Sequence, residues 1–128
     1  MIKFRLLFAA PVLAALAFTG TADAHTKLVS SSPAANATVA KPSKIVLTFN
    51  EKIVAKFAST TLTMTGMPGM ADHAPMKISG FTSVMSKDGK TVTLLMKRAL
   101  VAGTYNLKWV AAGADAHRME GSFTFTVK

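Results

Sequence analysis

Alternating apolar and polar residues, arranged in short stretches between turn residues, constrain the fold of this chain more than any other feature. In KIVLTF, for example, Ile45, Leu47 and Phe49 recur at every second position. Because successive side chains of a strand point to opposite faces, this spacing predicts strands with one buried face. The same pattern recurs in 91–96, after an Asp88-Gly89 pair typical of hairpin turns, in 105–109 and 123–127, and more weakly in 26–30, 57–63 and 77–84. No stretch has a sustained helical period, so we expect a single all-β sandwich or barrel of about seven strands.

Residues 1–24 have the features of a secretory signal peptide. Two basic residues precede an apolar run at residues 6–18, and the sequence ADA at 22–24 matches a cleavage pattern of signal peptidase. The run is shorter than the roughly 20 apolar residues that span a bilayer, and no second run of that length follows. We therefore expect cleavage to leave an exported domain, residues 25–128, that begins at His25 and does not insert into a membrane.

Composition limits the ligands and partners that the chain can have. It contains no cysteine, eight methionines and three histidines, so a metal would have to be bound by thioethers, imidazoles, carboxylates, backbone groups or a terminal amine. The formal net charge is +9, and a basic balance raises nucleic acids and anionic surfaces as partners. The lysines are scattered, however, and the chain has one Trp and one Tyr. We therefore expect no nucleic-acid partner and assign the charge to solubility or to attraction of an acidic partner.

A methionine-rich stretch, TMTGMPGMADHAPM at residues 63–76, contains Met64, Met67, Met70, His73 and Met76. Its glycines and prolines disfavour a helix, so we expect a surface loop. Methionine also serves as adaptable filler under loops, but four methionines around one histidine exceed what that role explains. Thioethers are soft ligands with no proton to lose, and they select Cu(I). The stretch is therefore a candidate Cu(I) site.

Nitrogen and oxygen donors indicate a second candidate site. After cleavage, His25 would offer both its α-amine and its imidazole, and His117 would add a third nitrogen. Asp115 lies two residues before His117, so in extended backbone both side chains would point the same way, and Glu51 offers an alternative oxygen. Such a mixed set of ligands suits Cu(II). A lone histidine in a loop, or a carboxylate after a strand, is more often simply solvated, and that alternative stays open at this stage.

Four segments carry a family resemblance that covers essentially the whole expected mature chain, in order. They are HTKLVSSSPAANATVAKPSKIVLTFNEKI from residue 25, TMTGMPGMADHAPM, AGTYNLKWV and DAHRMEGSFTFTVK. Together they resemble the CopC/PcoC family of periplasmic copper-resistance proteins. The resemblance implies a Greek-key β-barrel or sandwich of immunoglobulin-like type in residues 25–128, located in the periplasm, that carries copper and has no catalytic activity.

The resemblance also implies ligands and partners. It assigns a Cu(II) ion to His25, Glu51, Asp115 and His117, and a Cu(I) ion to Met64, Met67, Met70, His73 and Met76. Many relatives lack these methionines, so the chain resembles a member with two sites. The implied protein partners are an inner-membrane copper transporter of CopD type, a multicopper oxidase, or both. Arg118 and Met119 stand where relatives often have proline, and the charge of Arg118 would weaken Cu(II) binding slightly.

Two other functions fit parts of the sequence. An N-terminal histidine with a second histidine also describes the copper brace of lytic polysaccharide monooxygenases, but those enzymes are usually larger and rich in surface aromatic residues. An immunoglobulin-like interaction module could use its methionines to grip a hydrophobic partner. That module would not explain why all three histidines, His25, His73 and His117, fall in the two candidate sites. We therefore expect a copper carrier.

Overall fold

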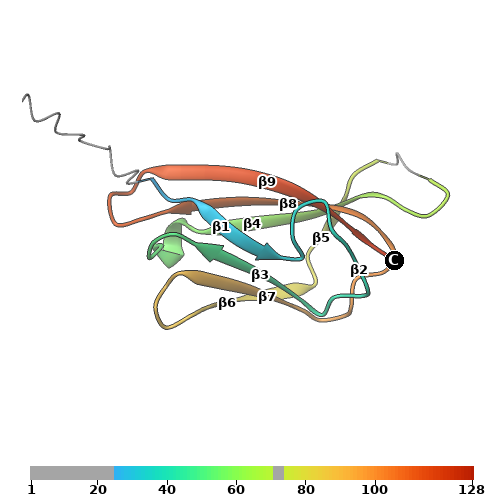
Figure 1. Ribbon diagram of the computed structural model, residues 1–128, viewed down its shortest axis with the longest axis horizontal. Helices are drawn as coiled ribbons and strands as arrows, with labels where there is room; N and C mark the ends of the chain where they lie inside the picture. Colours follow the sequence, from blue (N-terminus) through green and yellow to red (C-terminus); the bar gives the residue numbers. More distant parts are fainter. Residues whose placement is uncertain (1–24, 71–73) are drawn as a thin grey trace, which may run out of the picture.

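The computed structural model describes residues 25–70 and 74–128, which form two β-sheets packed face to face (Figure 1). The first sheet has the strand order β1-β3-β7-β6 and the second has the order β2-β9-β8-β4-β5. The strands are β1 (Leu28–Ser32), β2 (Thr38–Val39), β3 (Lys44–Phe49), β4 (Ser59–Gly66), β5 (Met76–Ile78), β6 (Phe81–Met85), β7 (Thr91–Met96), β8 (Gly103–Ala112) and β9 (Arg118–Val127), and a short 3-10 helix, η1 (Ala55–Phe57), follows β3. The expected all-β sandwich is confirmed. The expected leader, residues 1–24, and His73 lie outside the described residues.

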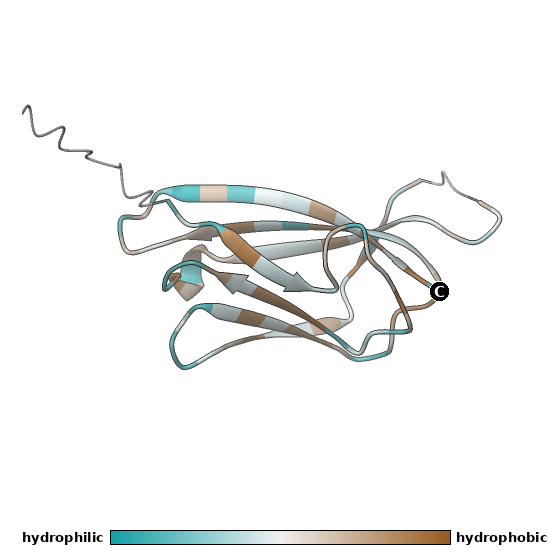
Figure 2. Ribbon diagram, in the orientation of Figure 1, coloured by the Kyte–Doolittle hydropathy of each residue, from teal (hydrophilic) through white to brown (hydrophobic). Residues whose placement is uncertain are grey.

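The core lies between the sheets and is built from the alternating positions that the sequence predicted. The buried side chains include Ile45, Leu47 and Phe49 of β3, Val92 and Leu94 of β7, Tyr105, Leu107 and Trp109 of β8, and Phe123, Phe125 and Val127 of β9. Phe49 meets Trp109 edge-on across the two sheets, with ring centroids 5.3 Å apart. Bands of hydrophobic and hydrophilic residues alternate along the strands in Figure 2. Burial of one face of each sheet therefore accounts for the layered architecture.

The described residues form more strands than the sequence pattern predicted. The weak stretch 77–84 is divided at Ser79 and Gly80 into β5 and β6, which belong to different sheets. The division is a tight turn in which the Phe81 N–H donates to the Ser79 carbonyl oxygen at 2.9 Å. Strand β2 pairs in parallel with β9 through two residues, too few to produce a periodic signal. Prediction from periodicity therefore joined β5 to β6 and missed β2.

The hairpin that joins β6 and β7 turns at Asp88 and Gly89, as the sequence predicted. Gly89 has a φ of +71°, in the left-handed region that glycine adopts without steric cost. Its N–H donates to the Ser86 carbonyl oxygen at 3.0 Å. The Asp88 carboxylate accepts hydrogen bonds from the Ser86 hydroxyl and the Lys90 N–H, and these lower the pKa of Asp88 because they stabilise its charged form.

No helix in the described part of the chain is long and apolar enough to cross a membrane.

Strand β8 runs along the sandwich and connects its two ends. Its ten residues, Gly103–Ala112, all pair with β9. At a rise of about 3.3 Å per residue, the two ends of β8 are about 30 Å apart. The end beyond Ala112 holds His25, the residues after β3 and the β8–β9 loop, and is called the His end. The end before Gly103 holds the hairpin that extends from β4 and the β7–β8 loop, and is called the Met end (Figure 1).

Candidate functional site

At the His end, the Asn50 side chain joins the segment before β1 to the segment after β3. Its amide nitrogen donates to the His25 carbonyl oxygen at 3.0 Å, and its amide oxygen accepts from the Lys27 backbone N–H at 2.8 Å. The Asn50 backbone N–H donates to the Lys27 carbonyl oxygen at 3.0 Å. These hydrogen bonds fix the backbone on both sides of Thr26. The position of His25 therefore follows from that of β3, a role for Asn50 that the sequence analysis missed.

A buried threonine holds the Glu51 carboxylate close to the start of the chain's first strand. Thr26 is 2% exposed, and its hydroxyl donates to Glu51 Oε1 at 2.7 Å. The same oxygen lies against Gly113, just after β8, where an added Cβ would collide with it and would lie 3.5 Å from Thr26 Oγ1. Gly113 therefore leaves the space that the carboxylate fills. Three segments far apart in sequence meet at this one side chain.

The β8–β9 loop brings Asp115 and His117 together through a turn rather than through extended backbone. The Ala116 N–H donates to the Gly113 carbonyl oxygen at 3.0 Å, and Ala116 has a φ of +62°. One Asp115 carboxylate oxygen accepts the His117 backbone N–H at 3.2 Å, and the other lies 3.3 Å from His117 Nδ1. The extended backbone that the spacing suggested is wrong, but the two side chains do lie together.

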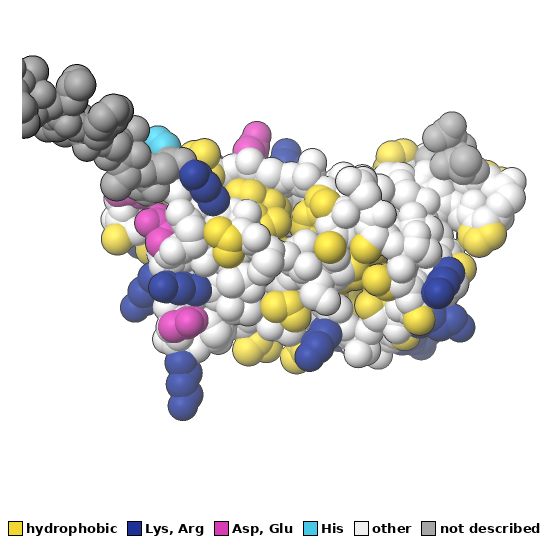
Figure 3. All heavy atoms as spheres, viewed as in Figure 1, with side chains coloured by type: hydrophobic (Ala, Val, Ile, Leu, Met, Phe, Trp, Pro, Cys, Tyr) yellow, Lys and Arg dark blue, Asp and Glu magenta, His cyan; other side chains and the backbone are white. Residues whose placement is uncertain are grey.

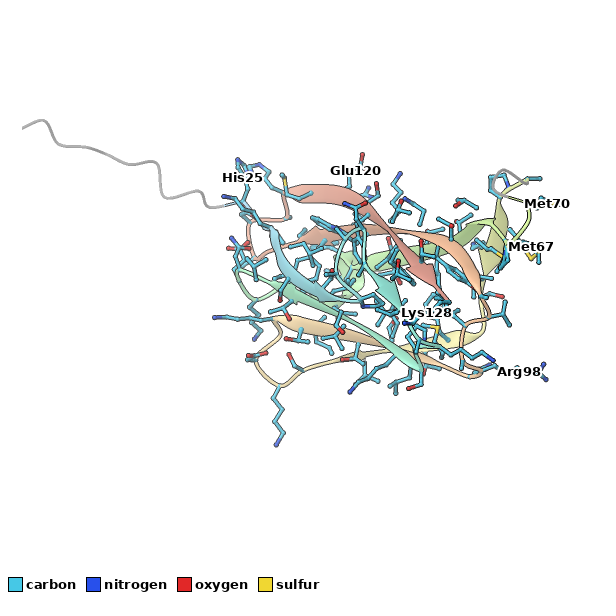
Figure 4. All side chains as sticks on the ribbon, turned by 45° about the vertical axis from the view of Figure 1, so that its right-hand side comes forward. His25, Met67, Met70, Arg98, Glu120 and Lys128 are labelled. Atoms are coloured by element: carbon cyan, nitrogen blue, oxygen red, sulfur yellow. The ribbon has the colours of Figure 1, made fainter. Side chains whose placement is uncertain are left out.

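His25 and His117 are neighbours at the His end. Their ring centroids are 5.9 Å apart and both residues are exposed (His25 is labelled in Figure 4). Glu51 is bonded to Thr26 and Asp115 to His117, so the four predicted residues share one end without converging on one point. Within residues 25–70 and 74–128, no group of three or more histidine, aspartate or glutamate side chains is arranged to hold a metal. Rotation of exposed imidazoles, which is fast, would be needed to bring these donors onto one ion.

Two of the four predicted methionines lie in strands at the Met end. Met64 belongs to β4, where it pairs with Met76 of β5 on one side and with Tyr105 of β8 on the other. Met64 is 4% exposed, whereas Met76 is 56% exposed. The prediction of a loop throughout residues 63–76 is therefore wrong at both ends of the stretch. Pairing with neighbouring strands satisfies the backbone there, despite the glycines and prolines between them.

A tight turn carries the other two methionines beyond the strands. Met67 and Met70 exchange both of their backbone hydrogen bonds at 2.9 Å. Pro68 and Gly69 lie between them, and the φ of +80° at Gly69 after a proline is typical of a type II turn. The two methionines are 44% and 55% exposed and lie on the part of the chain that projects from the sandwich in Figure 4.

An apolar pocket of about 430 Å³ opens beside this hairpin. Four thioethers contribute to its walls, those of Met64, Met67, Met76 and Met96. Met96 comes from β7 in the opposite sheet, and the sequence analysis missed it because its alternation marked it only as a core residue. Gly103 leaves room for Met64, since an added Cβ would lie 2.9 Å from Met64 Cε and 2.7 Å from the Gly66 carbonyl oxygen. Both candidate sites thus depend on a glycine at an end of β8.

The far wall of the pocket is fixed by Tyr105. Its hydroxyl donates to the Val101 carbonyl oxygen at 2.7 Å, which ties the β7–β8 loop to the core. Burial raises the pKa of Tyr105, so the hydroxyl keeps the proton that it donates. Of the five residues predicted to bind Cu(I), the structure brings Met64, Met67 and Met76 to this pocket, places Met70 beside Met67, and does not describe His73.

Comparisons with known proteins identify relatives over most of the chain. The family model of the CopC domain matches residues 28–128. The chain is 43% identical to copper resistance protein C of Escherichia coli over 108 residues. The matched stretch covers 84% of this chain and 85% of that protein. It is also 43% identical to copper resistance protein C of Pseudomonas syringae pv. tomato over 126 residues. That matched stretch covers 98% of this chain and 95% of the relative. The crystal structure of PcoC, a methionine-rich copper resistance protein from Escherichia coli, is similar with a TM-score of 0.74 and 41% identity, over 82% of this chain and 100% of that chain.

Proposed function

The chain belongs to the CopC family of copper-resistance proteins, and on this basis we propose that it is a periplasmic copper carrier with two separate sites. Cu(II) is bound at the His end and Cu(I) at the Met end. The observation that carries the proposal is the segregation of exposed donors among the described residues, with imidazoles at one end of β8 and exposed thioethers at the other (Figure 4). Ligand softness then assigns each oxidation state to its own end.

In the proposed Cu(II) site, His25 supplies two ligands after cleavage, its α-amine and its imidazole. His117 supplies a second imidazole, and Asp115 either orients that ring or adds an oxygen, since it already contacts His117 Nδ1. Glu51 supplies a carboxylate whose position is set by the Thr26 hydroxyl. The hydrogen bonds of Asn50 support this assignment, because they hold the His25 backbone beside Glu51 before any metal arrives.

In the proposed Cu(I) site, Met67, Met70 and Met76 supply exposed thioethers, with His73 as the nitrogen donor. Met64 is buried in the wall of the same pocket, so it would reach an ion only from the pocket side. Thioethers need not lose a proton, whereas the amine and imidazoles of the other site must be deprotonated. The affinity for Cu(II) should therefore fall more steeply than that for Cu(I) as the pH is lowered.

Exposed donors support a carrier rather than a storage protein or an enzyme. His25, His117 and the three exposed methionines are all open to solvent, so a partner could contact a bound ion and replace its ligands one at a time. Copper is then the cargo of the protein and no reaction is catalysed. The partners that fit this role are an inner-membrane copper transporter, a multicopper oxidase, or both.

Native mass spectrometry of the exported protein with each copper ion tests the proposal. We expect a chain that begins at His25, binds one Cu(I) and one Cu(II), and holds both at once. A total of one ion when both are supplied, or tight binding of neither, would contradict it. Oxidation of a glycan in the presence of copper and reductant would point instead to a monooxygenase.

A further inference from the structure

We propose that the Met end is a docking surface for an acidic segment of a partner protein, with one apolar side chain of that segment entering the methionine pocket. The inference rests on the proposed carrier function, because it identifies the kind of partner that could reach the Cu(I) site. It is carried by two features of the same surface, a basic rim and an apolar pocket.

The two ends differ in net charge, because basic side chains lie at both ends whereas the acidic ones lie mainly at the His end. The basic side chains on the segments that meet at the Met end are Lys41, Lys44, Lys77, Lys97, Arg98 and Lys128. The acidic residues of the described chain, Glu51, Asp88, Asp115 and Glu120, lie on segments at or toward the His end. Figure 3 shows the acidic side chains on the half of the molecule nearer His25. The sequence adds Asp72 in the methionine stretch, outside the described residues, and the balance at the Met end remains positive.

Backbone hydrogen bonds hold this basic rim together. The Met96 N–H donates to the Ser43 carbonyl oxygen at 2.9 Å, and the Lys97 N–H donates to the Gly80 carbonyl oxygen at 2.8 Å. The residues after β7, which include Lys97 and Arg98, are therefore held against the segment before β3 and against the β5–β6 turn. Lys97 and Arg98 also line the methionine pocket directly. A negative segment that reached the pocket would meet both charges.

Apolar side chains are exposed inside this rim. Met67, Met70, Met76 and Val101 are between 44% and 58% exposed. Exposed apolar clusters bordered by polar groups are typical of binding surfaces, and methionines adapt to the shape of what they bind. The pocket, with a volume of about 430 Å³, has room for an inserted apolar side chain.

This geometry favours a protein segment over two other occupants. A second copy of the chain would bring two basic rims together, which disfavours association by like charge. An anionic membrane surface would satisfy the lysines but would offer no single side chain for the concave pocket. An acidic segment with one apolar residue satisfies both the rim and the pocket.

A short peptide of Asp and Glu residues with one central Met provides the test. Its binding to the metal-free exported protein can be measured by fluorescence anisotropy at low and at high ionic strength. We expect saturable binding that weakens with salt, because surface charges are screened. The double substitution Lys97→Glu and Arg98→Glu should weaken binding about tenfold, and Val101→Ser about fivefold.

Matched variants at other places on the surface separate docking from general charge and hydrophobicity. Lys87→Glu with Lys90→Glu changes the net charge by the same amount near the β6–β7 turn. Val29→Ser removes a valine of β1 that is 58% exposed, the same fraction as Val101. Both control variants should bind the peptide like the unaltered protein.

Several outcomes would overturn the docking surface. Equal losses of peptide binding in the test and control variants would do so, as would equal binding of a peptide with Ser in place of Met. Binding of phosphatidylglycerol vesicles with the same dependence on Lys97 and Arg98 would point to a membrane surface instead. A concentration-dependent dimer in sedimentation, strengthened by Lys97→Glu with Arg98→Glu, would point to a second copy of the chain. Because the peptide is tested without metal, loss of docking leaves the copper titrations of the carrier proposal unaffected. If those titrations failed, the peptide measurement would still show whether the Met end binds an acidic segment.

Discussion

At the His end, hydrogen bonds among three segments distant in sequence fix the candidate donors, whereas at the Met end a strand, a turn and a neighbouring strand carry most of them. The Asn50 amide and the Thr26 hydroxyl position His25 and Glu51. The Met67 and Met70 donors depend on their own turn and on pairing between β4 and β5. The difference indicates that contacts between distant segments position the candidate donors at the His end, whereas local chain structure positions them at the Met end.

At each end, a glycine at or next to a terminus of β8 leaves room for a candidate donor side chain. Gly113 leaves space for the Glu51 carboxylate, and Gly103 leaves space for the Met64 thioether. The strand between them buries one face in the core and is fully paired with β9. A change at one end should therefore leave the other end undisturbed, and each prediction below depends on that independence.

The largest effect should come from one extra residue before His25. A glycine in that position converts the α-amine into an amide and removes a ligand from the His end. Loss of a group that only hydrogen-bonds to a ligand typically costs about 10- to 100-fold in metal affinity, so loss of a ligand itself should lower the affinity for Cu(II) by more than about 100-fold. Competition with a chelator at fixed pH measures it. The affinity for Cu(I) should not change, and a parallel loss of Cu(I) binding would argue against independent ends.

A somewhat smaller effect is expected when Met67 and Met70 are both replaced by Ile. The substitution keeps apolar bulk on the turn and removes two sulfurs, so the affinity for Cu(I), and for Ag(I) as its soft mimic, should fall by about 100-fold. The affinity for Cu(II) should stay the same. Replacing Met85 and Met119 by Ile is the matched control, since these half-buried methionines lie outside the pocket. Undiminished Cu(I) affinity in the first variant would return the turn to a packing role.

The smallest effects should come from the two glycines, and they should be reciprocal. Gly113→Ala displaces the Glu51 carboxylate, so it should weaken Cu(II) binding by about 10-fold and leave Cu(I) binding intact. Gly103→Ala crowds Met64 and the Gly66 backbone, so it should weaken Cu(I) binding by a similar factor and destabilise the fold by about 1–3 kcal/mol. Thermal unfolding separates the stability effect from the metal effect. Equal damage to both sites by either variant would contradict the comparison.

Local pattern was enough to predict the strands that form the core. Period-two alternation identified the inward residues of β3, β8 and β9, because each of these strands has one buried face. It joined β5 to β6, since periodicity does not reveal that a chain changes sheets at Ser79 and Gly80. It also missed β2, which is only two residues long.

The sequence predicted candidate donor residues, which stay a prediction, and it did not predict the contacts that position them. Spacing and residue type identified the methionines and the Asp115–His117 pair. Asn50, Thr26 and Gly113 act through contacts between segments that only the fold brings together, and nothing in their local sequence marks them. Met96 was missed for the same reason, because it reaches the pocket from a strand of the opposite sheet. Met64 was assigned to a loop because the glycines and prolines that follow it conceal the strand that contains it.

Methyl spectra of the methionines test the central claim, that the two ions bind at opposite ends, in one sample. Met119 follows His117 by two residues, whereas Met67 and Met70 lie at the other end of β8, about 30 Å away. Paramagnetic broadening falls steeply with distance. One equivalent of Cu(II) should therefore broaden the Met119 methyl signal and leave those of Met67 and Met70 sharp, and Ag(I) should then shift Met67 and Met70 without moving Met119. Broadening of Met67 and Met70 by the first equivalent of Cu(II), as strong as that of Met119, would contradict the account.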